Sequence, residues 1–101
     1  MHLSREEALF ILEMWWKAQT PLRVFFSRPG ADRQFRATIS ELTRSAVKLV
    51  SGSETFHVEL EGAEFNGDQN AAASSDYQAY LVSEFRDGDR CYFYVPRVAS
   101  P

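Results

Sequence analysis

The sequence predicts a mainly β protein, in which an N-terminal α-helix packs on a small, bent antiparallel β-barrel of about five or six strands. The first observation is a series of short segments between residues 22 and 61 in which apolar and polar side chains alternate. Such alternation is typical of antiparallel strands with one buried face. The second is that short breaks containing Gly, Pro or Ser separate these segments. The third is a single helical pattern that precedes them.

The bulk composition predicts one folded domain, residues 1–101. Hydrophobic residues make up 45% of the chain, which is enough for a packed interior. The formal net charge is −3. This charge argues against nucleic acid as an obligatory partner, because phosphate contacts need clustered Lys and Arg, but it does not exclude a local basic patch.

The compartment is inferred from the cysteine and from the apolar segments. Cys91 is the single cysteine, so no disulfide forms within the chain, which fits a reducing environment. The N-terminal residues lack the basic start and long apolar run of a signal peptide. The most apolar segment, residues 8–16, is too short to span a bilayer and contains Glu13. We therefore expect a cytoplasmic protein with no membrane contact.

The helix is expected from about residue 5 to residue 18. Ser4 and Glu7 have the spacing of a capping box, and Pro21 sets the limit at the other end. The apolar residues are too numerous for one narrow stripe, and Phe10 falls outside the main face. Either the helix plugs the open end of the sheet, or part of it, with Phe10 or Trp15, forms an interface with a partner.

The expected strands cover about residues 22–28, 34–42, 46–51, 55–61, 78–85 and 91–96. Phe56, Val58 and Leu60 show the clearest alternation and are expected to face inward. The pair Asp87-Gly88 favours a tight hairpin turn. Residues 66–76 are small and polar without a period, which predicts a mobile loop that is either a disordered tip or a functional segment.

The order of the predicted elements up to residue 65 is helix, short strand, Gly-containing turn, long bent strand, tight turn, strand, Gly turn and strand. Ala37, Ile39, Leu42 and Thr43 stand on the second strand. The order resembles the Sm-like fold, in particular its bacterial RNA chaperone branch, where a Gly, a hydrophobic residue and a hydrophobic-Asp pair occupy those positions. The resemblance implies a small β-barrel. RNA binding in that family uses a basic, aromatic motif near the fourth strand, where this chain has an acidic segment, residues 55–61.

Residues 39–49 are also similar to the strand-turn-strand at the centre of PilZ domains. Those domains bind a cyclic dinucleotide through an Asp/Asn-x-Ser-x-x-Gly motif and an upstream Arg-x-x-x-Arg. Here residues 41–46, Glu-Leu-Thr-Arg-Ser-Ala, replace the first motif, and the second does not occur upstream. A PilZ-like chain of this kind is implied to be a member that binds no nucleotide and acts through protein contacts.

Catalytic, metal and cofactor sites are not predicted. His2 and His57 lack metal-ligand spacing with each other or with Cys91, which is expected to be a buried or half-buried structural thiol. The five glycines are scattered singly, so no phosphate-binding loop is indicated. Glu59 and Glu61 share one strand face and are expected to be solvated. We therefore predict a protein that is not an enzyme and has no cofactor.

The arginines around the first predicted hairpin give the only local basic signal: Arg23, Arg28, Arg33 and Arg36. They form either an anion-binding or RNA-backbone surface or an exposed face with salt bridges to nearby acids. Phe25 lies beside Arg23, and an aromatic residue between cations favours a contact surface.

We predict a non-enzymatic binding or assembly module that works by protein-protein interaction or self-assembly. An incomplete barrel leaves sheet edges open, and a neighbouring subunit commonly covers such edges, so a homo-oligomer is expected. The candidate interface residues are Phe10, Trp15 and Phe25. The alternative is RNA or nucleotide binding through the four arginines.

Overall fold

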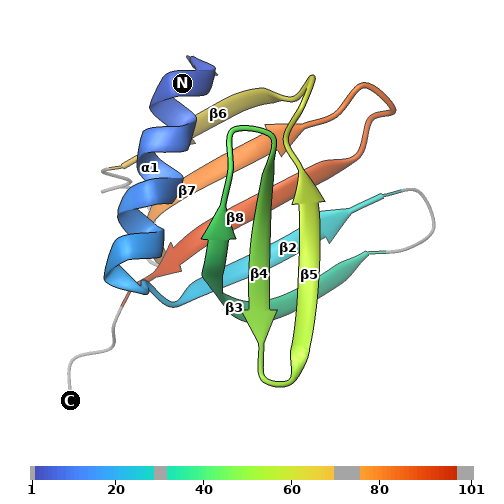
Figure 1. Ribbon diagram of the computed structural model, residues 1–101. Coiled ribbons are helices and arrows are strands. Elements are labelled where there is room, and N and C mark those ends of the chain that lie inside the picture. Colours follow the sequence, from blue (N-terminus) through green and yellow to red (C-terminus); the bar gives the residue numbers. More distant parts are fainter. Residues whose placement is uncertain (1, 29–31, 70–75, 98–101) are drawn as a thin grey trace.

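The computed structural model describes residues 2–28, 32–69 and 76–97. The protein is mainly β, as predicted, with one helix, α1 (Arg5–Ala18), and an eight-stranded antiparallel sheet (Figure 1). The strands are β1 (His2–Leu3), β2 (Leu22–Ser27), β3 (Arg33–Leu42), β4 (Ala46–Ser51), β5 (Glu54–Glu59), β6 (Glu64–Asp68), β7 (Tyr77–Glu84) and β8 (Arg90–Pro96). Their order across the sheet is β1-β6-β7-β8-β2-β3-β4-β5.

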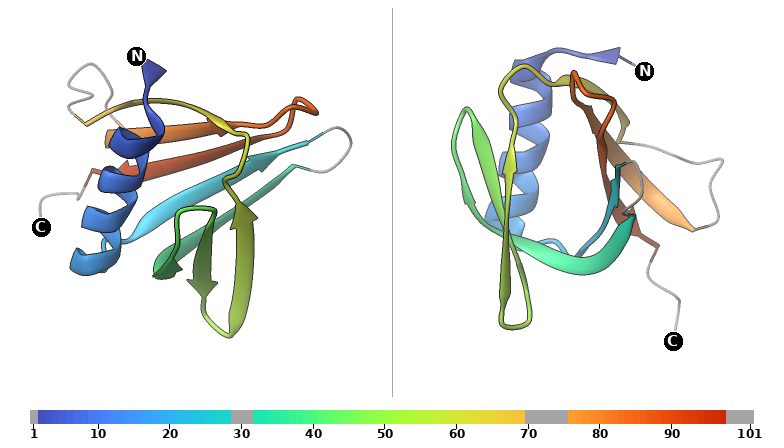
Figure 2. Two further views of the ribbon diagram at one scale, coloured as in Figure 1. Left: turned by 45° about the horizontal axis from the view of Figure 1, so that its top comes forward. Right: turned by 90° about the vertical axis from the view of Figure 1, so that its right-hand side faces the viewer.

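Strand β3 bends the sheet into two parts. Its first half pairs with β2, from Leu22 opposite Ala37 to Phe26 opposite Arg33. Its second half pairs with β4, and the register shifts between Ile39 and Glu41. A bulge of this kind bends a strand and increases its twist. The β4-β5 and β7-β8 hairpins therefore stand on opposite sides and are joined across the bottom by β3 (Figure 2).

The sheet has two end strands, β1 and β5, and these are not hydrogen-bonded to each other in the described part of the chain. The sheet is therefore bent and open, with more strands than the five or six expected. In the residues described, no helix is both long and apolar enough to cross a membrane.

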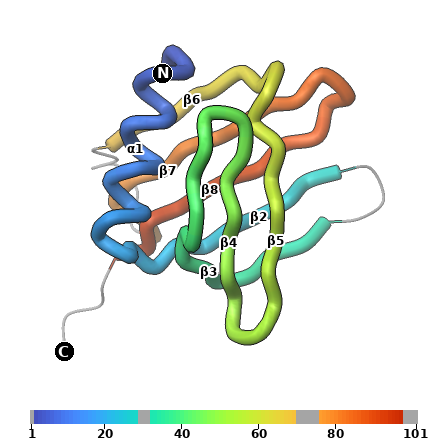
Figure 3. Tube along the Cα trace, in the orientation of Figure 1, coloured from blue at the N-terminus to red at the C-terminus, as the bar shows by residue number. Residues whose placement is uncertain are grey.

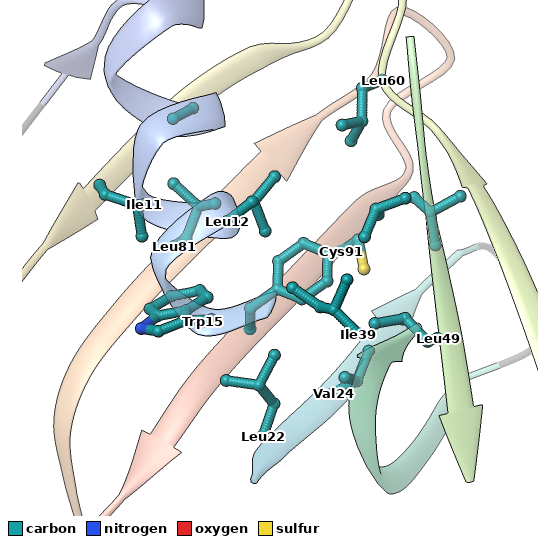
Figure 4. Packing of buried hydrophobic residues seen from close by; sticks show 14 of the residues in the cluster. Ile11, Leu12, Trp15, Leu22, Val24, Ile39, Leu49, Leu60, Leu81 and Cys91 are labelled. Carbon is teal, nitrogen blue, oxygen red and sulfur yellow. The ribbon is translucent and has the colours of Figure 1, made fainter. Parts of the chain in front are cut away.

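The hydrophobic core lies between α1 and the inner face of the bent sheet (Figure 4). Ala8, Ile11, Leu12 and Trp15 are the buried residues of α1. They meet residues from both parts of the sheet, among them Leu22, Val24, Ile39, Leu49 and Leu81. Trp15 is only 5% exposed. Its predicted interface role is therefore corrected, because its ring belongs to the core and offers almost no surface to a partner.

The ends of α1 follow local rules. The Ser4 N–H donates to Glu7 Oε1 at 3.0 Å, and the Glu7 N–H donates to Ser4 Oγ at 3.1 Å, which confirms the capping box. These hydrogen bonds from Ser4 lower the pKa of the Glu7 carboxyl. At the other end Gln19 has a φ of 51°, a left-handed conformation that closes the last turn.

Two strands were not predicted, β1 and β6. Strand β6 includes residues 66–68, so the prediction of a mobile loop from residue 66 is wrong there, while residues 70–75 lie outside the described part. Gly67 explains why β6 has no strand-like pattern. A Cβ at Gly67 would lie 2.7 Å from the Tyr80 carbonyl oxygen and 3.0 Å from Leu3 Cδ1, so only Gly lets β6 approach β7 this closely.

Candidate functional site

The part of the sheet that runs β6-β7-β8-β2-β3 has an inner face toward the core and an outer face away from it. Val24 on β2 and Phe93 on β8 are opposite each other, fully buried on the inner face. Because side chains alternate along a strand, their neighbours in sequence lie on the outer face. The register places Arg23 opposite Tyr94 and Phe25 opposite Tyr92 there.

Five aromatic rings follow one another across this outer face, and we call them the tyrosine face: Phe25, Tyr77, Tyr80, Tyr92 and Tyr94. Ring centroids are 5.7 Å apart for Phe25 and Tyr92, and 5.9 Å for Tyr92 and Tyr94, whose planes differ by 5°. Tyr77 lies 4.8 Å from Tyr94 and 5.7 Å from Tyr80. All of these separations fall in the range of favourable aromatic pairs, so the rings form one continuous, partly exposed apolar surface.

The charges beside the tyrosine face are separated by sign except for Arg90, which lies on the acidic side. Arg23 and Arg36 are exposed and directly opposite each other on β2 and β3. Neither takes part in an ion pair in the described part of the chain. On the other side of the rings, Glu64 and Glu84 are directly opposite each other on β6 and β7. Like charges placed directly across a ladder are destabilising, so the isolated sheet gains nothing from either pair.

Arg90 moderates the acidic side. It lies opposite Glu84 on the outer face, and its guanidinium approaches the Tyr92 hydroxyl at 3.5 Å. The pKa of Arg90 is raised, first by this contact with Tyr92 and then by the charge of Glu84. Glu64 has no such neighbour across its ladder, so it is the less compensated of the two acids.

The electrostatics of the rings themselves centre on Tyr94. Burial, followed by the nearby phenols of Tyr77, Tyr92 and Tyr80, raises the pKa of Tyr94 above its usual value of 10.0. The Tyr94 phenol therefore stays neutral at physiological pH and keeps its hydroxyl hydrogen as a donor. A shallow hollow of about 210 Å³ lies beside it, lined by Arg23, Gln34, Asp76, Tyr77, Tyr94 and Pro96.

The structure divides the four predicted arginines into two pairs. Arg23 and Arg36 lie on the outer face beside Tyr94. Arg33 is opposite Phe26, a residue of the inner face, and its guanidinium lies 4.6 Å from the Phe56 ring centroid. Arg28 follows β2 and its guanidinium lies 5.9 Å from the Phe26 ring centroid. Anion binding by all four arginines would therefore need a ligand that reaches both faces of one hairpin.

The other predicted residues are distributed over the surface and the core. Phe10 is 62% exposed and has Met14 one turn further along α1, so it remains a candidate interface residue. Phe25 belongs to the tyrosine face. His57 is exposed and its Nε2 lies 3.0 Å from Glu59 Oε1. Cys91 is fully buried, as predicted, and burial raises the pKa of its thiol far above the usual range.

Sequence reasoning did not find the tyrosines of this face. The signal was present in β8, where Cys91, Phe93 and Val95 alternate with Tyr92 and Tyr94. Both sets are apolar enough to form a core, so the period alone does not say which set is buried. A strand with two apolar faces in a small domain indicates a second contact surface, and this is the inference that the pattern supported.

Within the described residues, no group of three or more His, Cys, Asp or Glu side chains could hold a metal ion. Comparisons of the chain with models of protein families, with curated proteins and with solved structures give no match. The likenesses to Sm-like and PilZ-like proteins therefore stay predictions, and the argument for a function rests on the surface of this chain.

Proposed function

We propose that the protein is a non-enzymatic assembly module in which two copies bind each other through the tyrosine face. The observation that carries this proposal is the separation of charge across that face, with two arginines that form no ion pair within the described residues on one side of the rings and two carboxylates on the other. Tyr and Arg are also the residues that most often dominate the energy of protein interfaces.

A two-fold axis makes such a face complementary to itself. The axis lies in the interface, perpendicular to the line between the two charged groups and through its midpoint. Rotation about it places the arginines of one copy opposite the carboxylates of the second copy. Arg23 and Arg36 of each copy then face Glu64 and Glu84 of the other, and the rings meet in the middle. Each like-charge pair, which is unfavourable in the single chain, gains partners of opposite sign.

A charge-exchange experiment tests this arrangement. One variant carries Arg23→Glu with Arg36→Glu, and a second carries Glu64→Lys with Glu84→Lys. Each variant has like charges on both sides of the rings, so we expect its self-association to weaken at least about tenfold. Mixing the two variants should restore a dimer, because one face then has carboxylates on both sides of the rings and the other has cations on both sides. Sedimentation velocity at several concentrations measures all three samples.

The matched control for the arginine variant is Lys17→Glu with Arg44→Glu, which lowers the net charge by the same amount at exposed positions away from the tyrosine face. It should associate like the parent chain. A parent chain that stays monomeric at about 100 μM contradicts the proposal, because a specific interface of standard size should be populated at that concentration. A mixture of the two reversed variants that stays monomeric contradicts it as well.

Nucleic acid is the alternative occupant of the same face, because bases stack on tyrosines and arginines contact phosphates. The acids on the face and the net charge of −3 oppose it. A monomeric parent chain that binds single-stranded RNA, with an affinity that falls steeply as salt rises, would decide for this alternative.

The finer assignment of the fold is also a proposal. We infer that α1 and the strands β2 to β5 correspond to the helix and first four strands of a small barrel of Sm-like or PilZ-like kind. The support is that these strands are consecutive neighbours in the sheet and that β3 bends between two partners. The strands β6 to β8 then extend such a barrel on its other side.

A further inference from the structure

The end of β2 and the start of β3 lie on the side of the molecule away from α1 (Figure 3). A pocket of about 390 Å³ is lined by residues of these two strand ends and of β5. It is lined by Phe26, Arg28, Asp32, Arg33, Phe35, Phe56 and His57. Its three phenylalanines belong to the inner side of the bent sheet, so the pocket is separate from the tyrosine face. Its volume lies within the range of small-molecule sites.

The apolar part of the pocket is a set of rings that the core leaves partly uncovered. Along β2 the inner residues Leu22 and Val24 are buried, whereas Phe26 is partly exposed. Phe35 and Phe56 stack on each other with centroids 4.1 Å apart and planes 19° apart. Both are also partly exposed at the margin of the core. These rings provide an apolar wall that a planar group could cover.

The polar part consists of two guanidinium groups with unused hydrogen-bond donors. Arg33 contacts Glu54 through Nη2 at 2.9 Å, and Arg28 approaches Asp89 through Nε at 3.6 Å. Neither Glu54 nor Asp89 lines the pocket. A guanidinium has five N–H donors, and in the described part of the chain no other hydrogen bond engages those of Arg28 or Arg33. A carboxylate can accept two of them at once.

We propose that this pocket binds a small aromatic carboxylate, with the ring against the phenylalanines and the carboxylate between Arg28 and Arg33. The N–H donors of Arg28 and Arg33 that Asp89 and Glu54 leave unused are suited to a carboxylate, and Asp32 is the one carboxylate among the lining residues. The side chains of Arg28 and Arg33 are more than half exposed, so they can move. The Arg33 guanidinium, which lies over the Phe56 ring, can therefore make room there for the ring of the ligand.

The probe is 2-naphthoate, with 2-naphthalenemethanol as the neutral compound of the same shape, and isothermal titration calorimetry measures both. We expect saturable binding of the carboxylate, and binding of the alcohol at least about tenfold weaker, because the alcohol lacks the charge-assisted bonds. Arg28→Gln and Arg33→Gln should each weaken the carboxylate at least about tenfold. Arg44→Gln, an exposed arginine outside the pocket, should leave the affinity unchanged.

Phe56→Ala should weaken both compounds, since it removes a wall that both use, and the arginine variants keep the test valid if Phe56→Ala does not fold. Three results would overturn the proposal: no saturable binding of the carboxylate at about 10 mM, equal binding of carboxylate and alcohol, or full affinity in both arginine variants. Repeating the titration on the variant with Arg23→Glu and Arg36→Glu separates this pocket from the tyrosine face. The affinity of this variant for 2-naphthoate should equal that of the parent chain, whether or not the chain dimerises.

Discussion

Ser83 is the clearest single-residue anomaly in the core. Its side chain lies on the inner face of β7, opposite Phe65 and Cys91, and the residue is 0% exposed. Its hydroxyl has no hydrogen-bond partner in the described part of the chain. A buried hydroxyl without a partner costs about 1–3 kcal/mol relative to water, so this serine weakens the fold that contains it.

Ser83→Ala should therefore leave the free energy of unfolding unchanged or raise it by about 1 kcal/mol, since the lost packing of one oxygen is smaller than the relieved cost. Chemical denaturation followed by circular dichroism measures the difference. Ser53→Ala in the exposed turn between β4 and β5 is the control and should change stability by less than about 0.5 kcal/mol. A loss of more than about 1 kcal/mol in Ser83→Ala would mean that the hydroxyl makes a bond in solution.

At the scale of elements, Gln19 joins α1 to the sheet. Its Nε2 donates to the carbonyl oxygens of Trp16 at 2.7 Å and of Ile39 at 2.9 Å. The first bond closes the end of the helix, and the second reaches the strand at the point where β3 bends. The same residue has a left-handed backbone, which costs a non-glycine residue about 1–2 kcal/mol.

Two substitutions at Gln19 separate these effects. Gln19→Ala removes both bonds and keeps the backbone strain, so it should lower the free energy of unfolding by about 2 kcal/mol. Gln19→Gly removes the bonds but relaxes the backbone, so its loss should be smaller by about 1 kcal/mol. Thermal and urea unfolding measure both, with Lys17→Ala on the exposed side of α1 as the control. Equal losses of unfolding free energy for Gln19→Ala and Gln19→Gly would show that the left-handed backbone at this position has no measurable cost.

The elements that the sequence predicts are those whose signal is local. The capping residue Ser4 and the alternation around Val58 depend on near neighbours, and α1 and β5 were expected close to their observed bounds. Strand β6 depends instead on the close approach of Gly67 to β7, which begins at residue 77. The residues next to Gly67 in the sequence give no signal of this pairing. The tyrosine face was missed for a related reason. Both sides of β8 are apolar, and only its neighbours decide which side is buried.

For the molecule as a whole, the two candidate surfaces lie on opposite sides of the same hairpin. The outer face carries the rings and the separated charges, while the inner side carries the pocket of Phe26, Phe35 and Phe56. A dimer formed through the outer face leaves that pocket open to solvent on both copies. Assembly and ligand binding would then be independent properties of one chain, which the two experiments above measure separately.

The raised pKa of Tyr94 makes the stability of the fold, and with it the proposed dimer, sensitive to alkaline pH. The free phenol has a pKa near 10.0, and the folded protein holds the pKa of Tyr94 above that value. The neutral phenol is therefore favoured in the folded state. The stability from this shift is fully present below about pH 10 and is lost as the pH rises through the folded pKa. A Tyr94 phenolate would also add negative charge to the face through which the proposed dimer forms.

We therefore expect the dimer to dissociate, and the free energy of unfolding to fall, as the pH rises above about 10, with phenolate absorbance near 295 nm rising over the same interval. Tyr94→Phe removes the group with the raised pKa, so its stability should fall less over this interval, while its ring contacts at neutral pH are kept. High salt at pH 7.5 is the control. It screens the contacts of Arg23 and Arg36 and so weakens the dimer, but it does not ionise the Tyr94 phenol. A dimer that persists after Tyr94 has ionised, as judged by the phenolate absorbance that Tyr94→Phe lacks, would show that the rings do not lie in the contact.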